Sequence, residues 1–488
     1  MNFPKSDLGV KIQIIGMRWL FIYICSVEEV IHQIMHRICF IFLFLVFLTM
    51  NNYTFAVPPD STFDSIQRPR QFKKGWKPFP FPVLGYNTDI GFQYGLALDL
   101  PYYGDGSIFP KYFHSFYLEA SFTTKGGSIF QFFYDSEKLI KNIRVTADVS
   151  YLTEQALDFY GFNGYKAVYH HSWEDDKDTA DYISRVFYRH QRKLFKFALS
   201  FQGKFLAENL RWLAGATVLN IAIDSVNVNK LNKGQKEDKK LPDTAGLYNN
   251  YVSWGVLSSK ESRGGMNNFI KLGLIYDTRD NEANPMRGLW SEITFVIAPE
   301  FLGDGNYGFI KLAVIQRQYF TIIKNKLSFT YRLAYQGTIA GKVPFYVQPL
   351  MINSWEKTTT IDGLGGSRNL RGILRNRVVG DGMVYANAEF RWKIVDFNLF
   401  RQPCYLGANL FSDAGMVVQE VPINKSGIPI TVDQSAYFSP TSEYPHISIG
   451  GGLKIAYNEN TVLSADLGFA PDNRDGRIGI YIGFGFLF

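Results

Sequence analysis

The chain has 488 residues, of which 46% are hydrophobic and 16% aromatic, and it contains 43 glycines and 3 cysteines. Its net charge of +7 is small and spread along the sequence, so we expect no nucleic-acid partner. With so few cysteines, we expect neither a disulfide framework nor a cysteine metal site.

Apart from one short N-terminal run, no segment approaches the roughly 20 apolar residues that a membrane-spanning helix needs. Only helices and closed barrels satisfy every backbone polar group within lipid. If the protein spans a membrane, it must therefore do so as a β-barrel.

The first part of the chain, 1–56, is predicted to be a signal peptide. A polar start at 36–37 precedes an apolar run at 38–50, and a polar segment then ends at the small residue Ala56. The apolar run has the length of a signal-peptide core and is too short to span a membrane. Met35 lies just before this pattern and is a candidate for the true start. The alternative is a long N-terminus with a signal anchor.

The next segment, 57–80, is rich in proline and basic residues and is predicted to be a periplasmic tether or a plug. From 81 to 488, short segments alternate between apolar and polar residues and are separated by Gly, Asn, Asp and Pro. Evenly spaced strands of this kind are typical of an all-β sandwich or barrel. We count about sixteen strands, near 88–100, 114–124, 127–136, 142–152, 182–191, 194–203, 210–226, 267–279, 289–302, 306–320, 326–340, 382–396, 403–418, 445–458, 461–470 and 476–488.

Long polar insertions interrupt this pattern. Those at 227–266, 341–381 and 419–444 follow odd-numbered strands, and they share the outer face if the first strand runs outward. The insertion at 152–181 does not obey this order. Either one periplasmic loop is unusually long, or the early strand boundaries are misplaced.

The predicted strand 382–396 has two very different faces, because successive side chains of a strand point to opposite sides. One face is wholly apolar, and the other carries Glu389, Arg391 and Lys393. In a soluble sandwich the charged face would meet water. In a membrane barrel the apolar face would meet lipid and the charged face would line the lumen.

The last predicted strand, 476–488, favours the membrane barrel. Its uninterrupted apolar face ends in Phe484, Phe486 and Phe488. A soluble edge strand of this kind would invite aggregation, whereas outer-membrane barrels present a terminal strand ending in an aromatic residue to their assembly machinery. We therefore predict a transmembrane antiparallel β-barrel in the outer membrane of a diderm bacterium, in preference to a secreted β-sandwich.

Four motifs point to a known family. The loop GGSRNLRGI at 365–373 resembles the Gly-Gly…Arg-Gly-aromatic motif on the sixth outer loop of the outer-membrane assembly-factor superfamily, the BamA/TamA-like or bacterial surface antigen proteins. DTRDNEANPMRG at 277–288 resembles a characteristic turn of this family. ANAEFRW at 386–392 is similar to its twelfth strand, and LFSDAG at 410–415 is similar to its thirteenth-strand motif.

The resemblance covers roughly 81–488 and departs at Ile373, where the family has an aromatic residue. It implies that the arginine-bearing outer loop folds into the lumen and supports barrel integrity and activity. On chemical grounds the planar guanidinium of Arg371 suits carboxylates, and Glu389 and Asp413 are candidate lumen-facing partners. The alternative is that Arg371 faces lumen water. Three glycines would let the loop pass close to the wall: Gly365, Gly366 and Gly372.

The resemblance also implies a role in inserting or translocating proteins, through a seam between the first and last strands that opens sideways. Three glycines of the last strand would weaken its packing, namely Gly479, Gly483 and Gly485, unless they simply fit a crowded barrel wall. Segment 57–80 is too short for the periplasmic POTRA modules with which family members recruit partners. Expected partners are outer-membrane lipids, unfolded outer-membrane or secreted proteins, and separate periplasmic proteins. The alternative function is a passive pore or a structural barrel.

No enzymatic or cofactor motif is present, because the sequence lacks GxSxG, HExxH and GxxxxGK[ST]. His170 and His171 lie beside acidic residues, but a solvated acidic loop is favoured over a metal site. His446 and Ser448 form the only nearby Ser/His pair on a strand, and nothing else supports a lipid hydrolase. We therefore expect hydrogen bonding and hydrophobic transfer, with no cofactor and no covalent catalysis.

Overall fold

The computed structural model describes residues 73–109, 111–177, 180–282, 284–354, 362–399, 402–457 and 461–488. These residues lie within one compact unit, Phe72–Phe488. The predicted signal peptide and most of the predicted tether lie outside the described residues. In the described ranges, no helix is long and apolar enough to cross a membrane.

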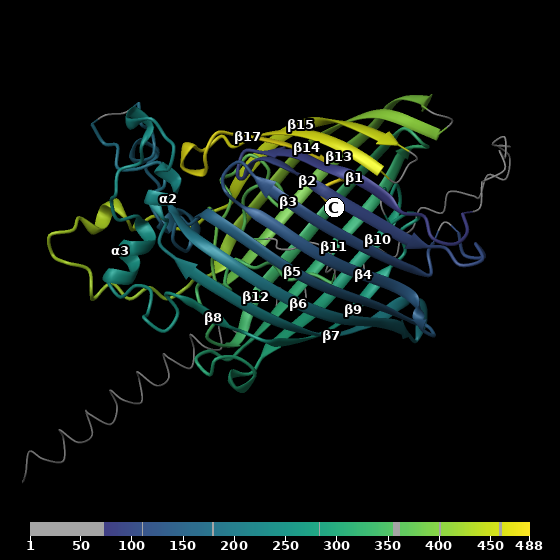
Figure 1. Cartoon of the computed structure of the whole chain (residues 1–488), viewed down its shortest axis with the longest axis horizontal. Coiled ribbons are helices and arrows are strands. Elements are labelled where there is room, and N and C mark those ends of the chain that lie inside the picture. Colours follow the sequence, from purple (N-terminus) through teal and green to yellow (C-terminus); the bar gives the residue numbers. More distant parts are fainter. Residues whose placement is uncertain are drawn as a thin grey trace, which may run out of the picture. The chain divides into compact units, whose positions relative to one another are not determined.

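Within the described ranges, seventeen strands form one antiparallel sheet that closes where β17 pairs back with β1 (Figure 1). Both β8 and β9 pair with β7, so together they count as one strand of the barrel wall. The barrel is therefore sixteen-stranded. The predicted all-β barrel of about sixteen strands is thus confirmed. The strands are β1 (Phe79–Asn87), β2 (Gly91–Tyr102), β3 (His114–Thr123), β4 (Ser128–Ile140), β5 (Ile143–Asp158), β6 (Arg189–Phe205), β7 (Ala207–Asp224), β8 (Gly264–Met266), β9 (Phe269–Asp277), β10 (Gly288–Ala298), β11 (Phe309–Ile323), β12 (Leu327–Gly341), β13 (Gly382–Leu399), β14 (Gln402–Gln419), β15 (His446–Tyr457), β16 (Thr461–Phe469) and β17 (Ile478–Phe484).

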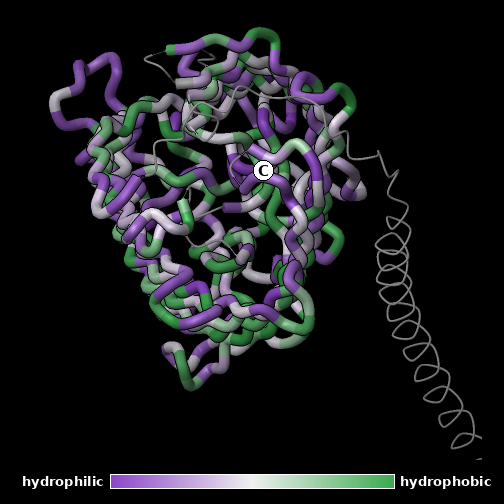
Figure 2. Tube along the Cα trace, turned by 90° about the vertical axis from the view of Figure 1, so that its right-hand side faces the viewer, coloured by the Kyte–Doolittle hydropathy of each residue, from purple (hydrophilic) through white to green (hydrophobic). Residues whose placement is uncertain are grey.

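The faces of β13 distinguish a membrane barrel from a sandwich. Phe390 and Trp392 are 49% and 55% exposed, whereas Glu389 is 1% exposed. The apolar face therefore points out of the sheet and the charged face points into the closed interior, as expected for a barrel surrounded by lipid. Figure 2 shows the same alternation of hydrophilic and hydrophobic residues along the other traces of the wall.

The order of the first strands differs from the prediction. The predicted strand 182–191 is mostly loop, and the true first strand, β1, was missed. Pro80 and Pro82 argue against a central strand, because proline has no N–H to donate. They are tolerated here because this part of β1 pairs with β2 only. When β1 is counted, the insertion at 152–181 follows the fifth strand, which is odd-numbered like the strands before the other insertions. The predicted early strand boundaries were therefore wrong.

All long loops now emerge from one end of the barrel, which we call the outer end. They include two short helices, α2 (Val228–Asn232) and α3 (Leu247–Ser253), and six 3-10 turns. Those turns are Gly164–Lys166, His171–Trp173, Glu237–Lys239, Glu300–Leu302, Gln434–Ala436 and Asn473–Asp475.

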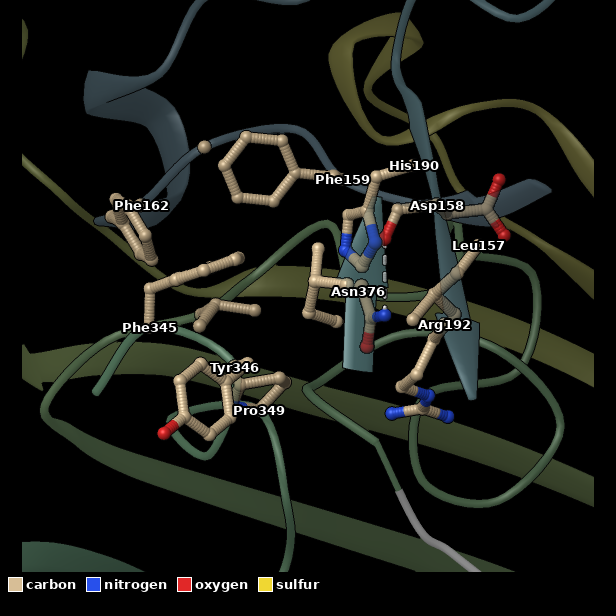
Figure 3. A pocket seen from close by; sticks show the side chains of 13 residues that line it. Leu157, Asp158, Phe159, Phe162, His190, Arg192, Phe345, Tyr346, Pro349 and Asn376 are labelled. Carbon is tan, nitrogen blue, oxygen red and sulfur yellow. Dashed lines mark hydrogen bonds between the residues drawn. The ribbon is translucent and has the colours of Figure 1, made fainter. Parts of the chain in front are cut away.

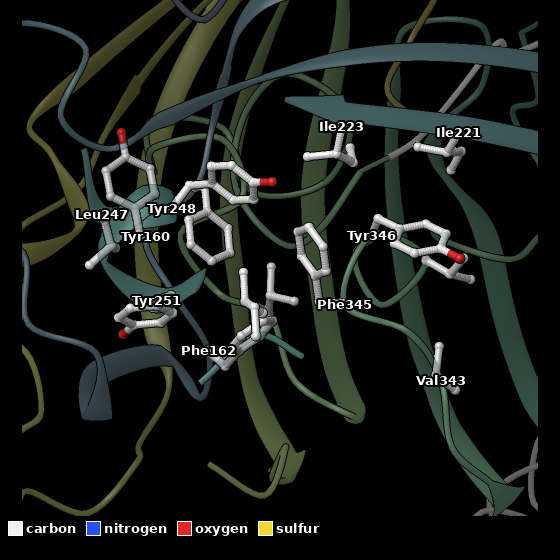
Figure 4. Packing of buried hydrophobic residues seen from close by; sticks show 14 of the residues in the cluster. Tyr160, Phe162, Ile221, Ile223, Leu247, Tyr248, Tyr251, Val343, Phe345 and Tyr346 are labelled. Atoms are coloured by element: carbon white, nitrogen blue, oxygen red, sulfur yellow. The ribbon is translucent and has the colours of Figure 1, made fainter. Parts of the chain in front are cut away.

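Four of the outer loops pack into a common hydrophobic cluster, which we call the outer cap (Figure 4). It joins the β5–β6, β7–β8, β12–β13 and β14–β15 loops to apolar side chains at the outer ends of the strands, such as Ile221 and Ile223. The outer cap was not predicted, because these insertions are polar in overall composition. Its loop members are Phe159, Tyr160, Phe162, Phe187, Tyr188, Leu247, Tyr248, Tyr251, Trp254, Leu257, Val343, Phe345, Tyr346, Val347, Val379, Ile428 and Phe438.

Candidate functional site

The arginine loop is the part of the β12–β13 connection from 362 to 378. Leu364 and Val378 close its base, each donating its backbone N–H to the other's carbonyl oxygen. Inside the loop, the Oδ1 atom of Asn369 accepts two backbone N–H groups at 2.7 and 2.8 Å. Ile373, where the family has an aromatic residue, is buried in the same hydrophobic cluster as Leu364. These contacts give the loop a fixed shape.

The guanidinium of Arg371 lies between carboxylates of two neighbouring strands. Its Nε and Nη2 donate to Asp413 on β14, at 3.0 and 3.1 Å, and its backbone N–H donates to the same carboxylate at 3.1 Å. Its Nη1 donates to Glu389 on β13 at 3.1 Å. The Arg371 side chain is 1% exposed. The structure therefore brings together the three residues that the sequence proposed as partners.

The surroundings of Arg371 keep it charged. Burial alone would lower its pKa, but the charges of Asp413 and Glu389 outweigh this and raise the pKa above its ordinary value. A third carboxylate, Asp466 on β16, lies 3.6 Å from Nη1, and the centroid of the Phe411 ring lies 3.4 Å from the guanidinium carbon. A two-pronged hydrogen bond of this kind is among the stronger polar contacts in proteins.

The glycines of the arginine loop are required by close approach and backbone conformation. Gly372 has a φ of 95°, and a Cβ there would lie 2.6 Å from the carbonyl carbon of Gly468 on β16. Gly365 has a φ of 117°, and its Cβ would lie 1.9 Å from the carbonyl oxygen of Leu374. At Gly366 a Cβ would meet the carboxylate of Asp89 at 2.7 Å. A side chain at any of these positions would displace the loop.

A second ionic cluster holds the start of the loop. Asp362 accepts two hydrogen bonds from Arg192 on β6, at 2.7 and 3.0 Å, and a further one from Arg375. Glu154 on β5 pairs with both arginines, at 2.6 and 2.7 Å. Burial would raise the pKa of Asp362, but the two arginines lower it overall. The loop is thus anchored to opposite sides of the barrel interior.

The seam between β1 and β17 is short. In the described residues, the two strands are in register only at Tyr86–Ile482 and Asn87–Tyr481. Hydrogen bonds between Thr88 and the backbone of Ile480 extend this contact at the outer end, at 2.8 to 3.2 Å. By contrast, β1 pairs with β2 along its whole length. The inner part of the seam therefore has few backbone hydrogen bonds to break.

The arginine loop contacts both strands of the seam. Asn87 on β1 donates from Nδ2 to the Oγ atom of Ser367 at 2.9 Å. On β17, the hydroxyl of Tyr481 accepts the backbone N–H of Gly372 at 2.9 Å. Asn87 and Tyr481 are register partners. The arginine loop therefore contacts both members of one register pair across the seam.

Asp89, in the β1–β2 turn, lies beside this bridge. Its Oδ2 atom is buried and has no hydrogen-bond partner among the described residues. Burial, and then the charge of Asp158, raise the pKa of the Asp89 carboxyl to about 7. The turn at the end of the seam therefore has an acid that titrates near neutral pH.

The end of the chain differs from the predicted strand 476–488. β17 ends at Phe484, and the backbone turns at Gly485, which has a φ of 88° and donates its N–H to Val462. Arg391 on β13 then donates to the carbonyl oxygen of Phe488 at 2.8 Å, and its guanidinium lies 4.1 Å from the ring of Phe486. These two aromatic residues contact an inward-facing cation instead of continuing the outer apolar face.

The three glycines of this segment have different surroundings. A Cβ at Gly479 would lie 2.1 Å from the hydroxyl oxygen of Tyr481, so Gly479 makes room for the ring that reaches the arginine loop. This agrees with the crowded-wall alternative. A Cβ at Gly483 or Gly485 would meet no heavy atom within 4 Å, so neither is needed to relieve crowding.

Sequence reasoning missed Ser367, Asn87 and Tyr481. Tyr481 had a detectable signal, because it is the only large polar side chain on the otherwise glycine-rich face of its strand. Asn87 had none, since the strand that carries it was not predicted.

The family is decided by a match to a sequence model. The model of the Omp85 superfamily domain matches residues 112–488, well over half of the chain. The chain belongs to the Omp85 superfamily. This confirms the family to which the four motifs pointed. The described residues of this Omp85 protein form the barrel and include no POTRA module.

Solved structures that are similar to the Omp85 barrel include those of BamA and CdiB. BamA from Haemophilus ducreyi lacking POTRA domains 1–3 has 14% identity over 85% of this chain and 71% of that chain, with a TM-score of 0.48. CdiB from Escherichia coli has 11% identity over 83% of this chain and 63% of that chain, with a TM-score of 0.49. Comparison with curated protein sequences gave no match.

Two other sites were considered in the sequence, a metal site and a Ser/His pair. Among the described residues, no group of three His, Cys, Asp or Glu side chains is placed to hold a metal ion. The hydroxyl of Ser448 is buried without a hydrogen-bond partner there, and the ring of His446 contacts Asp475 and Glu443 instead. Figure 3 shows a cavity lined by His190 of β6 and by cap residues that include Phe159 and Phe345. Its volume of about 20 Å³ leaves room for roughly one water molecule.

Proposed function

We propose that this Omp85 barrel assists the insertion or translocation of proteins at the outer membrane of a diderm bacterium, by opening the seam between β1 and β17. Membership of the superfamily supports a protein substrate. The single observation that carries the proposal is the short seam, in which only Asn87–Tyr481 and Tyr86–Ile482 are in register. From the sequence we expected glycines to weaken the seam. In this proposal the seam is weak because few residue pairs join β1 to β17.

The chemistry of the β1 edge fits such an opening. Pro80 and Pro82 are two residues apart, so their nitrogens face the same edge of the strand, and neither can donate a hydrogen bond. They hinder closure of β1 onto β17, while β2 holds the other edge. Unpaired backbone groups along an open seam can pair with a guest strand. Hydrogen bonding and transfer of apolar side chains to lipid would then be the whole reaction, without covalent catalysis or a cofactor.

The arginine loop would act in this proposal as a lock inside the lumen. Arg371 fixes the loop to β13 and β14, and Ser367 and Gly372 connect it to the two seam strands. Outer-membrane lipids, unfolded outer-membrane or secreted proteins, and periplasmic proteins are the proposed partners.

The alternative of a passive pore is less well supported. The four loops of the outer cap pack their aromatic side chains together at the outer end, where a pore would need an open path. A structural barrel without insertase activity remains the second outcome of the test.

The test is a disulfide across the seam. Tyr86 and Ile482 are register partners, and both are exposed on the lipid face, so cysteines there can be joined in a variant in which Cys404 is replaced by alanine. The barrel in proteoliposomes is expected to accelerate folding of an unfolded outer-membrane barrel substrate, measured by heat-modifiability. The disulfide is expected to abolish this acceleration, and reduction is expected to restore it.

The matched control is a disulfide between Leu84 and Tyr94. These residues are register partners on β1 and β2, are similarly exposed, and do not cross the seam. This variant is expected to keep its activity when oxidised. Equal activity of the oxidised seam variant and its reduced form would exclude seam opening as the mechanism.

A further inference from the structure

His446, the first residue of β15, is completely buried beneath the outer loops. Its Nδ1 atom lies 2.6 Å from Oδ1 of Asp475, in the β16–β17 loop. Its Nε2 atom lies 3.2 Å from Oε1 of Glu443, in the β14–β15 loop. The side chains of His446 and Asp475 are 0% exposed, and that of Glu443 is 7% exposed. Each ring nitrogen therefore faces a carboxylate oxygen out of contact with solvent.

This arrangement requires an additional proton. A neutral imidazole has one N–H and one lone pair, whereas an ionised carboxylate can only accept. A neutral ring would direct its lone pair at a carboxylate oxygen, and only an imidazolium can donate on both sides. Both carboxylates already accept from other groups: Asp475 from the hydroxyl of Tyr165 at 2.6 Å, and Glu443 from the backbone N–H groups of Tyr165 and Val417 at 2.8 and 3.1 Å. Histidine is therefore the site for the proton.

Aromatic and charged side chains from the neighbouring outer loops surround His446 and its two carboxylates. The ring of Tyr165, in the β5–β6 loop, stacks on His446 with 3.8 Å between ring centroids. The guanidinium of Arg474 lies 4.2 Å from the centroid of the Tyr165 ring, and Arg474 pairs with Asp472 in the β16–β17 loop. Tyr444 of the β14–β15 loop stacks on Tyr165 as well.

The arginine loop also reaches this site, through Arg377. Its Nε atom lies 3.8 Å from Asp475, and its guanidinium donates to the carbonyl oxygens of Gly164 and Ala167, at 2.9 and 3.1 Å. The carbonyl oxygen of Asp475 also accepts the N–H of Leu374 at 2.8 Å. The histidine and its two carboxylates thus join the arginine loop to three other outer loops.

We propose that one proton on His446 holds these four outer loops together, and that its loss in alkaline medium releases them and loosens the arginine loop. The protonated ring favours the closed loops, so their stability is present at low and neutral pH and is lost as the pH rises. The proposal does not depend on whether the seam admits a substrate. It makes the outer end of the barrel sensitive to the pH of the surroundings of the cell.

Two measurements on the full barrel in nanodiscs test this inference. In the first, the ring of His446 is followed by NMR with isotope-labelled histidine, and it is expected to titrate above the ordinary value of about 6.5. Asp475→Asn is expected to lower this titration point. Its amide can donate to Nδ1 and its carbonyl can accept from Tyr165, which leaves a neutral ring fully bonded. Titration of His446 at or below about 6.5 would overturn the proposal.

In the second measurement, proteolysis of the outer loops is compared between pH 6 and pH 9, after correction for the protease's own pH profile on an unfolded substrate. Cleavage of the wild-type loops is expected to rise with pH, whereas in Asp475→Asn it stays low throughout. His190→Gln is the matched control, because this buried histidine of β6 contacts the carbonyl oxygen of Gln191 rather than a carboxylate, and it is expected to keep the wild-type profile. Wild-type loops that are cut equally at both pH values would contradict the release, even if His446 titrates high.

Discussion

At the scale of single residues, Arg371 explains why this loop stays in one place. Its guanidinium binds Asp413 through two nitrogens and Glu389 through a third, all out of contact with solvent. Taking a charge out of water is costly unless it is fully paired. The same cost holds the arrangement together, because removing one partner leaves the others charged and buried.

We expect Arg371→Ala to destabilise the barrel by about 3–5 kcal/mol, the usual cost of breaking a buried ion pair from one side. The measurement is the temperature at which the folded band disappears in heat-modifiability gels. Arg371→Lys, which keeps the charge without the planar fork, is expected to lie between alanine and wild type. The control is Arg368→Ala, since this side chain is exposed in the same loop. An unchanged transition in Arg371→Ala would show that the ion pairs do not hold the loop.

Asp89 gives a prediction that depends on pH. Because its folded-state pKa is raised to about 7, folding favours its protonated form, and this stability is lost as the pH rises from about 4 through 7. Asp89→Asn is expected to gain stability relative to the wild type between pH 5 and pH 8, measured by thermal unfolding in micelles. A wild type that gains stability relative to Asp89→Asn between pH 5 and pH 8 would contradict this assignment.

At the scale of elements, pattern and chemistry explain what the sequence could predict. Alternation identified most strands, and the chemistry of Arg371 identified Glu389 and Asp413 as partners. β1 was missed because Pro80 and Pro82 are incompatible with a strand paired on both sides, and only the register shows that one side is free. The loop before β6 was mistaken for a strand because Phe187 and Tyr188 belong to the outer cap, whose contacts are invisible in a single sequence.

The contact between the arginine loop and β17 leads to a prediction about the seam. Tyr481→Phe removes the acceptor of the Gly372 N–H and leaves a buried donor unpaired, which costs about 1–3 kcal/mol. We expect spin labels at Leu84 and Ile480 to show a broader distance distribution across the seam in this variant. Tyr319→Phe on β11 is the matched control, because its buried hydroxyl has no hydrogen-bond partner among the described residues. Equal distributions in both variants would mean that the loop does not restrain the seam.

At the scale of the whole molecule, the polarity of the barrel interior changes from the lumen to the outer end. The wall of the lumen is polar and ionic near Arg371, and it becomes apolar at the outer end, where the outer cap packs against residues such as Ile221. The outside of its wall carries the exposed large apolar side chains, as expected for a barrel surrounded by lipid. The cap is therefore a second hydrophobic core, formed by loops and enclosed by a membrane protein whose other apolar surface faces outward.

This arrangement predicts that the cap limits passage of ions through the barrel. Replacing 247–257, which includes α3 and contributes Leu247, Tyr251 and Trp254 to the cap, by a short Gly-Ser linker removes large buried aromatic side chains. We expect the variant to raise the conductance of single barrels in planar lipid bilayers, because water and ions can then reach the polar lumen from the outer end. Replacing 233–240 by a similar linker is the control, since these residues are exposed in the same loop, and it is expected to leave the conductance unchanged. A closed barrel in both variants would show that the barrier lies deeper, at the arginine loop, and a wild-type barrel as conductive as the 247–257 variant would restore the passive pore as the better function.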